Sequence, residues 1–110
     1  MRKFRHVYID IYMKNIWLIV CNRDYFNRKI QSEFECDART ISKEAAGSFG
    51  VYALNGKEVG VIWLEDWGSF AHEVFHATCW VLWGAGIPLV EESEEAYAYL
   101  INYLCKEFAK

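Results

Sequence analysis

The 110-residue chain lacks the sequence features of several protein classes. It has one proline and seven glycines, too few for a collagen-like or low-complexity chain. Its longest apolar run, Ile16 to Cys21, is the length of a strand, whereas a membrane span needs about 18 residues. The basic start, Met1 to Arg5, is not followed by the apolar segment and small-residue cleavage site of a secretory signal. We therefore expect a soluble, cytoplasmic protein with no membrane partner.

The four cysteines form no motif either. Cys21, Cys36, Cys79 and Cys105 lie far apart and include no CxxC pair, which argues against a zinc ribbon or a redox site. Without a secretory signal, a disulfide framework is not expected. Cys79 and Cys105 fall within apolar helical patterns, where a free cysteine behaves as a small core residue.

Basic charge is scattered along the chain. Residues 1–43 carry nine Lys or Arg against five Asp or Glu, residues 44–110 carry three against ten, and the net charge is −3. Nucleic-acid binding usually requires a dense basic patch, which these residues do not form. We interpret the charges as solvated surface, so a nucleic-acid partner is not expected and a DNA-associated regulator is the weakest functional hypothesis.

Apolar residues, by contrast, are abundant. They make up 54% of the chain, enough for one packed core, so residues 1–110 are expected to form a single domain. The alternating segment His6–Met13, the polar break Lys14-Asn15 and the apolar run Ile16–Cys21 predict a hairpin whose second strand lies inside a sheet. Asn22 is predicted to cap a short helix that reaches about Phe34.

The second half of the chain predicts another hairpin and two helices, after a connection over Cys36 to Gly47. Asn55-Gly56 supplies the two positive φ angles of a type I′ turn between Phe49–Leu54 and Lys57–Glu65. A helix is predicted from an N-cap at Asp66 to Gly84-Ala-Gly86, and a last helix over Glu92 to Phe108. The order indicates an α+β domain whose mostly antiparallel sheet comes from two hairpins.

The first of these two helices contains His72-Glu73-Val74-Phe75-His76, an HExxH motif. Residues four apart on a helix lie one above the other, about 6 Å along the axis, so two imidazoles can converge on one tetrahedral ion. Glu73 is rotated about 100° from His72 and projects beside such an ion, where it can take a proton from a water and deliver it to a leaving amine. The alternative is that both histidines are merely polar residues of an amphipathic helix.

Zinc requires a third protein ligand and an open fourth position. The candidates are His6 and the acidic cluster Glu91-Glu92-Ser93-Glu94-Glu95, which opens the last predicted helix. The eighteen residues between His76 and Glu95 are enough for a helix end, a turn and a second helix that packs back. Tyr99 follows Glu95 by four residues and could reach the site as a hydrogen-bond donor. The alternative role of the cluster is compensation of the helix dipole.

HExxH followed, after a short turn, by a glutamate on the next helix resembles the gluzincin group of zincin metallopeptidases. Within residues 66–105, the segments Phe70–Ala77, Gly86–Leu89 and Ser93–Leu100 resemble small metallopeptidases encoded by phages and prophages. The Asn-Glu pair common in larger gluzincins is absent.

This resemblance implies a small zincin-like domain with zinc as its cofactor. His72 and His76 would be zinc ligands, Glu73 the general base, and one glutamate of the 91–95 cluster the third ligand. We choose Glu95, because its Glu-x-x-Ala pattern also resembles the metal-binding helix of repressor-cleaving metallopeptidases of mobile elements. Glu94 and Glu91 remain alternatives. The cytoplasm would then be that of a bacterial host.

Two functional hypotheses follow. The first is a zinc-dependent metallopeptidase that hydrolyses a peptide or protein substrate with a zinc-activated water, Glu73 as general base, and Tyr99 or Tyr97 steadying the oxyanion. The alternative is a catalytically silent zincin-fold protein of phage or mobile-element origin that binds a host or phage partner. The exposed edge of the second hairpin would serve either, and the intact Glu73 favours the enzyme. The sequence does not specify an oligomeric state.

Trp80 and Trp83 follow His76 along the same helix, at four and seven residues. They are predicted either to wall a substrate pocket or, with greater weight, to be core or partner-facing aromatic residues, because most of the five tryptophans must be buried.

Overall fold

The computed structural model describes residues 2–33 and 44–110 and has the expected α+β architecture. These residues contain four strands, three α-helices and three 3-10 turns. In chain order the described elements are β1 (Lys3–Ile9), η1 (Asp10–Tyr12), β2 (Lys14–Val20), α1 (Arg23–Glu33), β3 (Gly47–Leu54), β4 (Lys57–Leu64), η2 (Trp67–Ser69), α2 (Phe70–Gly84), η3 (Glu91–Ser93) and α3 (Glu94–Phe108).

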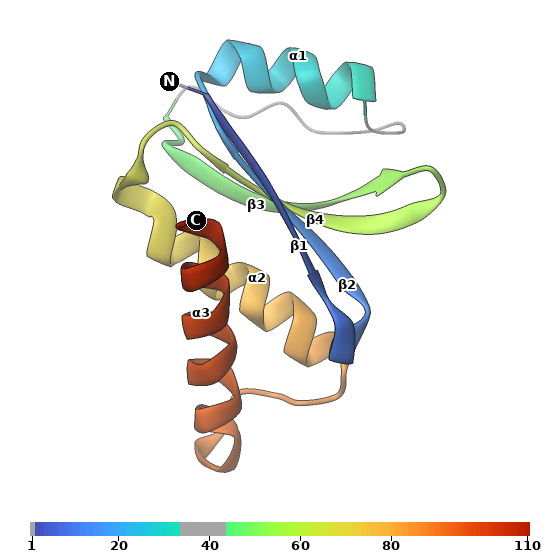
Figure 1. The fold of residues 1–110 in the computed structure, drawn as a ribbon, viewed down its shortest axis with the longest axis vertical. Coiled ribbons are helices and arrows are strands. Elements are labelled where there is room, and N and C mark those ends of the chain that lie inside the picture. The colour runs from blue at the N-terminus through green and yellow to red at the C-terminus, as the bar shows by residue number, and fades with distance from the viewer. Residues whose placement is uncertain (1, 34–43) are drawn as a thin grey trace.

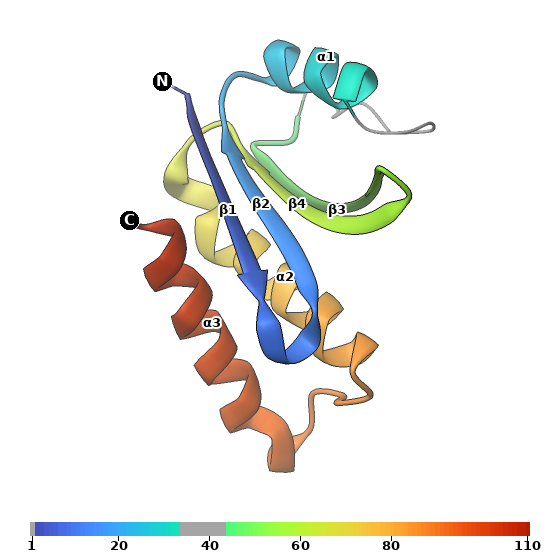
Figure 2. The same cartoon turned by 45° about the vertical axis from the view of Figure 1, so that its right-hand side comes forward.

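The strands form one sheet in the order β1-β2-β4-β3, covered by helices on both faces. β1 with β2 and β3 with β4 are antiparallel, whereas the central pair, β2 and β4, is parallel. Figures 1 and 2 show α1 on one face of the sheet and both α2 and α3 on the other. The prediction of a mostly antiparallel sheet built from two hairpins is therefore confirmed, and the parallel contact between the hairpins joins them.

The first hairpin turns earlier than the sequence predicts. Its first strand ends at Ile9, and residues 10–12 form a 3-10 turn that closes when the Met13 N–H donates to the Asp10 carbonyl at 3.1 Å. Met13 has a left-handed φ of 55°. Ile11 and Met13 are 81% and 76% exposed, so the predicted strand to Met13 and its buried face are wrong beyond Ile9. Alternating apolar residues look alike in a strand and in an exposed turn, which explains the error.

The predicted polar break at Lys14-Asn15 is wrong, because both residues belong to β2 and pair with Ile9 and Tyr8 of β1. The interior position of the second strand and the second hairpin are as predicted. β2 lies inside the sheet, and Ile16, Leu18 and Ile19 are at most 1% exposed. The β3–β4 turn has positive φ at both Asn55 and Gly56, as a type I′ turn requires.

The face of the sheet under α1 carries its own apolar core. Phe26 and Ile30 of α1 pack on Ile19, Val61 and Trp63, and all five are at most 1% exposed. The Trp63 ring stacks on Phe26 with centroids 5.5 Å apart, and its indole N–H donates to the Cys21 carbonyl at 3.1 Å.

Asn22 caps α1 as predicted, because its side-chain oxygen accepts from the Tyr25 N–H at 2.7 Å. The predicted helix end at Phe34 and most of the predicted connection from Cys36 lie outside the described residues.

The opposite face buries one side of α2 and of α3. Val74, Ala77 and Leu82 of α2 and Leu104 and Phe108 of α3 are all fully buried. α2 begins at Phe70, after η2, and ends at Gly84 with a positive φ at Gly86, close to the predicted stop. None of the helices in the described segments combines the length and the apolar character that crossing a membrane requires.

Gly60 of β4 leaves the space that two aromatic rings occupy between the sheet and α2. A Cβ on Gly60 would lie 2.9 Å from ring atoms of both Phe49 and Trp80. These rings pack against each other with centroids 5.8 Å apart, so neither can move away freely.

We therefore expect Gly60→Ala to lower the free energy of unfolding by about 1–3 kcal/mol, the usual cost of overpacking a core. Gly84→Ala is the matched control, because its Cβ would approach nothing closer than 3.8 Å. Urea unfolding followed by circular dichroism measures both. Equal stability of the two variants would show that the rings adjust around the added methyl group.

Candidate metal centre

The position of the HExxH motif follows from how α2 begins. The Asp66 carboxylate accepts from the Gly68 N–H at 2.8 Å and so caps the 3-10 turn that leads into α2. The helix then carries residues 72–76 in its first two turns, next to the sheet. The sequence prediction of Asp66 as a cap is confirmed for η2, one turn before the α-helix itself.

His72 and His76 face each other from successive turns. Their Nε2 atoms are 3.1 Å apart, and their rings are nearly perpendicular, at 74°. Two ring nitrogens this close either share one proton, with one N–H donating to the other nitrogen, or bind one cation. Zn–N bonds of about 2.0–2.1 Å at a tetrahedral angle separate two nitrogens by about 3.3 Å. The observed spacing therefore fits a divalent metal with little rearrangement.

Glu73 completes the only group of three metal-ligating side chains in residues 2–33 and 44–110. One ligand atom each from His72, Glu73 and His76 lie within 4.8 Å of one another. Both histidines are exposed, whereas Glu73 is 5% exposed. Burial raises the pKa of the Glu73 carboxyl above its ordinary value, and the two neighbouring histidines partly oppose that rise. The group thus combines two accessible ring nitrogens with one shielded carboxylate.

Gly47, the first residue of β3, explains how Glu73 is shielded. A Cβ at this position would lie 2.8 Å from the Cβ of Ser69 and 3.3 Å from Oε2 of Glu73. The backbone of β3 therefore passes directly beside the start of α2 and covers the carboxylate. A larger residue would push the strand and the helix apart.

A groove of about 630 Å³ runs between β3 and α2, and we call it the β3–α2 groove. Glu73 and His76 line it, whereas His72 does not. Most of its remaining surface is apolar and comes from three parts of the chain: Phe49 of β3, Phe75, Trp80 and Trp83 of α2, and Leu89 of the connection after α2. The site therefore opens into a space that could hold an apolar side chain beside the histidine pair.

The sequence predicted Trp80 and Trp83 either as walls of a pocket or as core or partner-facing residues, and the structure shows features of both. Trp80 is partly buried against the core and lines the groove, and the Lys14 ammonium lies 5.0 Å from the centre of its ring. Trp83 is 62% exposed at the same groove. Phe49 and Leu89 carry no local signal in the sequence, because only the fold brings them to α2.

Cys79 also lines the groove, at 8% exposure, and was predicted only as a core residue. Burial raises the pKa of its thiol, which therefore keeps its proton at neutral pH. It does not belong to the group of ligand atoms formed by the histidines and Glu73.

The glutamates of the 91–95 cluster are not brought to the histidines. Glu91, Glu94 and Glu95 are exposed, and none of them belongs to the group formed by His72, Glu73 and His76. The histidines lie in the first half of α2, and α3 starts beyond its other end (Figures 1 and 2). The sequence spacing allowed a return of the chain, but it did not determine where along α2 the next helix crosses.

The two tyrosines predicted to assist the site lie elsewhere. Tyr99 is 69% exposed and lines a different hollow, beside η1. Tyr97 is 2% exposed, and its hydroxyl donates to the Ile87 carbonyl at 2.8 Å. Tyr97 therefore holds the connection between α2 and α3.

His6, the other candidate ligand, is on the sheet face opposite α2. Its Nε2 is 2.6 Å from the side-chain oxygen of Asn15, and its ring stacks on Trp17 with centroids 4.7 Å apart. The His6 imidazole is therefore engaged by Asn15 and Trp17 on the face of the sheet that α1 covers, away from His72 and His76.

We expect Tyr97→Phe to lower the urea midpoint of unfolding, because the Ile87 carbonyl loses a buried donor. Tyr99→Phe, whose hydroxyl is on an exposed ring, should leave the midpoint unchanged. Neither change should alter metal affinity measured by calorimetry. An unchanged midpoint together with weaker metal binding in Tyr97→Phe would contradict the structural role and return Tyr97 to the site.

Comparison with known proteins adds no family to these observations. The chain matches no family model, no curated protein and no solved structure. What the site does is therefore inferred from the side chains of α2 and β3 and from the resemblance of the motif.

Proposed function

We propose that this protein is a zinc-dependent metallopeptidase with a zincin-like domain. The observation that carries the proposal is the meeting of the His72 and His76 Nε2 atoms at 3.1 Å, with a buried carboxylate one residue along the chain. The HExxH motif lies on a helix, α2, which is the context that this chemistry requires. The resemblance of residues 66–105 to small phage and prophage metallopeptidases supports the same function.

The donor set suits zinc. Zinc accepts neutral imidazole nitrogens and carboxylate oxygens in tetrahedral sites. His72 and His76 would hold the ion. Glu95, the third ligand expected from the sequence, with Glu91 and Glu94 as alternatives, would join them only if α3 shifted toward the first half of α2, because the structure holds these glutamates away from the histidines (Figure 1). When bound, zinc supplies Lewis-acid polarisation of a carbonyl and lowers the pKa of a water.

Glu73 is suited to move the proton. Its carboxyl is shielded by β3 and α2, and its pKa is raised by burial. A base whose pKa lies closer to neutrality than that of an exposed glutamate can both accept a proton from water and pass it to a leaving amine. The side chain reaches the β3–α2 groove, where a substrate carbonyl would lie.

The edge of the sheet offers a way to hold an extended substrate. β3 is an edge strand, and within the described residues no strand pairs with its outer side. A peptide that adds to this edge would run along the groove, and every second side chain would face α2. The aromatic lining at Phe49, Trp80 and Trp83 favours a large apolar residue next to the scissile bond.

The first test is the metal itself. We expect the purified chain to bind about one zinc ion per monomer in a calorimetric titration. His76→Ala should weaken binding by about 100-fold or more, because even residues that only support a ligand cost about 10- to 100-fold. His6→Ala is the matched control, since this histidine lies on the other face of the sheet. Equal zinc affinity of wild type and His76→Ala would refute the site.

The same titration tests the third ligand. In the arrangement described, Glu95→Gln, Glu91→Gln and Glu94→Gln should all bind zinc like wild type, because none of these glutamates lies with the histidines. A strong loss of affinity in Glu95→Gln alone would show that α3 shifts toward α2 and supplies the third ligand.

Glu73→Gln tests the catalytic role. The amide keeps the size of the side chain but cannot accept the proton, so zinc binding should persist while cleavage falls by about 10²–10⁴-fold. Unfolded casein and a mixed-sequence peptide library are the substrates, with products identified by mass spectrometry. Glu58→Gln, an exposed glutamate of β4, is the control and should cleave like wild type.

Cleavage at equal rates by wild type and Glu73→Gln would contradict the proposed mechanism. A wild-type protein that binds zinc and peptides but cleaves none would favour the alternative, a zincin-fold binding protein. Its β3 edge and groove would then serve recognition alone.

A further inference from the structure

Several exposed large apolar side chains of the described residues gather at two places. One group surrounds the β3–α2 groove and includes Phe75, Trp83 and Leu89. The other lies at the opposite edge of the sheet, on the turn after β1 and on α3; its members are Ile11, Tyr99 and Tyr103. The proposed peptidase activity makes no use of this second group.

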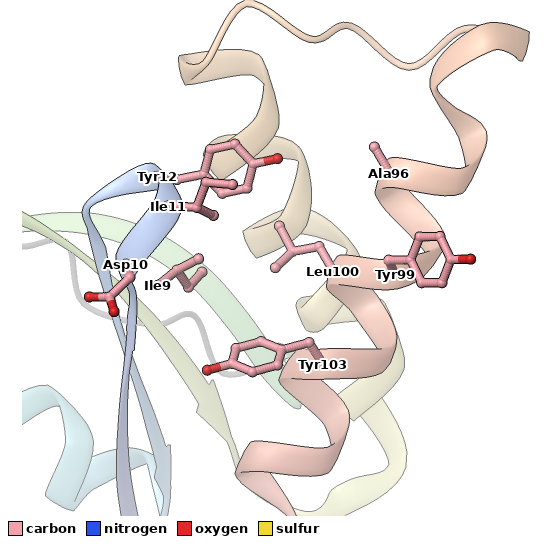
Figure 3. A pocket seen from close by; sticks show the side chains of 8 residues that line it. All are labelled: Ile9, Asp10, Ile11, Tyr12, Ala96, Tyr99, Leu100 and Tyr103. Carbon is pink, nitrogen blue, oxygen red and sulfur yellow. The ribbon is translucent and has the colours of Figure 1, made fainter.

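A hollow of about 490 Å³ lies within the second group, between η1 and α3. Figure 3 shows Tyr12 and Leu100 facing each other across it, and the small Ala96 leaves its upper end open. The Tyr99 ring projects outward from α3 beside the hollow (Figure 3). This surface thus carries an aromatic projection next to a mostly apolar hollow that is large enough for more than one side chain.

The charges of the same surface are divided between its two ends. Glu92 lies in η3 and Glu95 in the first turn of α3, at one end. Lys106 lies in the last turn of α3, and the Arg5 guanidinium reaches the same end of the helix, where it donates to the Lys110 carbonyl. Within the described residues, none of these four side chains forms an ion pair, whereas Lys110 is paired with Glu107 at 2.7 Å.

We propose that a second copy of this chain packs antiparallel against this surface, which we call the η1–α3 face. A two-fold axis midway between Leu100 and Ile101 sets Glu95 of each copy opposite Lys106 of the other, because the two residues are equally distant from that point, and it brings Tyr99 beside Tyr103 of the other copy. Each projecting Tyr99 then reaches the hollow of the partner copy. The isologous arrangement uses one surface twice, as dimers usually do.

The charge distribution is what selects a second copy in this orientation. Antiparallel packing brings the acidic end, with Glu92 and Glu95, against the basic end of the other copy, with Lys106 and Arg5. Parallel packing would juxtapose like charges, which is unfavourable at an interface. A nucleic acid would be repelled by the acidic half of the surface.

The first experiment measures the mass of the protein by sedimentation equilibrium, in the presence of a chelator so that metal plays no part. Wild type should be dimeric at about 100 μM, a concentration well above the dissociation constant of a micromolar dimer. Ile11→Asp and Tyr103→Glu should each be monomeric there. Val51→Asp, on the opposite edge of the sheet and 40% exposed, is the matched control and should remain dimeric.

Circular dichroism verifies that these exposed substitutions leave the fold intact. A monomeric wild type at this concentration would overturn the proposal. So would a dimer that survives both Ile11→Asp and Tyr103→Glu, because another surface would then form it.

The second experiment tests the antiparallel orientation by charge reversal. Glu95→Lys and Lys106→Glu should each weaken dimerisation by about tenfold or more, since each sets like charges opposite one another at both ends. An equal mixture of the two variants should dimerise again, because the heterodimer restores opposite charges at both ends. Failure of the mixture to recover would overturn the antiparallel arrangement. The readout is mass, so its outcome is independent of whether Glu95 also binds zinc.

Discussion

The rotation of α2 about its own axis is the constraint on which the rest of this structure depends. Val74, Ala77, Thr78, Val81 and Leu82 are fully buried against the sheet and α3. Burying one large aliphatic side chain contributes about 1.5–3 kcal/mol, so exposing several of them would cost a large part of the stability of a domain. A turn of the helix by one residue, about 100°, is therefore excluded. With the rotation fixed, His72 and His76 must face outward and Glu73 must lie at the boundary with β3.

The second condition is the close approach of the sheet to that helix. Gly47 lets β3 pass beside Ser69 and cover Glu73, and Gly60 makes room for Phe49 and Trp80. These two glycines set the depth of the groove and the burial of the carboxylate together. The burial that raises the pKa of Glu73 thus results from backbone packing. No neighbouring charged side chain is needed to produce the rise.

Features that depend on a few neighbouring residues could be predicted from the sequence. The type I′ turn at Asn55-Gly56, the cap at Asn22 and the convergence of His72 with His76 are of this kind, because each is set by spacing within one element. The end of β1 was mispredicted, since Ile11 continues an apolar alternation although the backbone has already turned. The alternation reports which residues are apolar, and it does not report where hydrogen bonding to β2 stops.

Features that depend on how elements cross could not be predicted. Whether Glu95 reaches the histidines depends on the angle and the offset between α2 and α3, which the eighteen intervening residues leave free. The same holds for Phe49 and Leu89, which meet Trp83 only in the folded chain. Tyr99 is a parallel case, because helical spacing from Glu95 suggested a common site, yet Tyr99 lines the hollow beside η1, away from His76.

The two apolar surfaces lie at opposite edges of one sheet, and this separation lets both be used at once. The β3–α2 groove adjoins the strand at one edge, and the η1–α3 face adjoins β1 at the other. A dimer formed through α3 leaves the outer side of β3 open to an extended peptide in each copy. It also covers the most exposed apolar residues of the turn and of α3. In the proposed dimer, one apolar surface of the domain would stay free for a peptide, while the other would be shielded from water by the second copy.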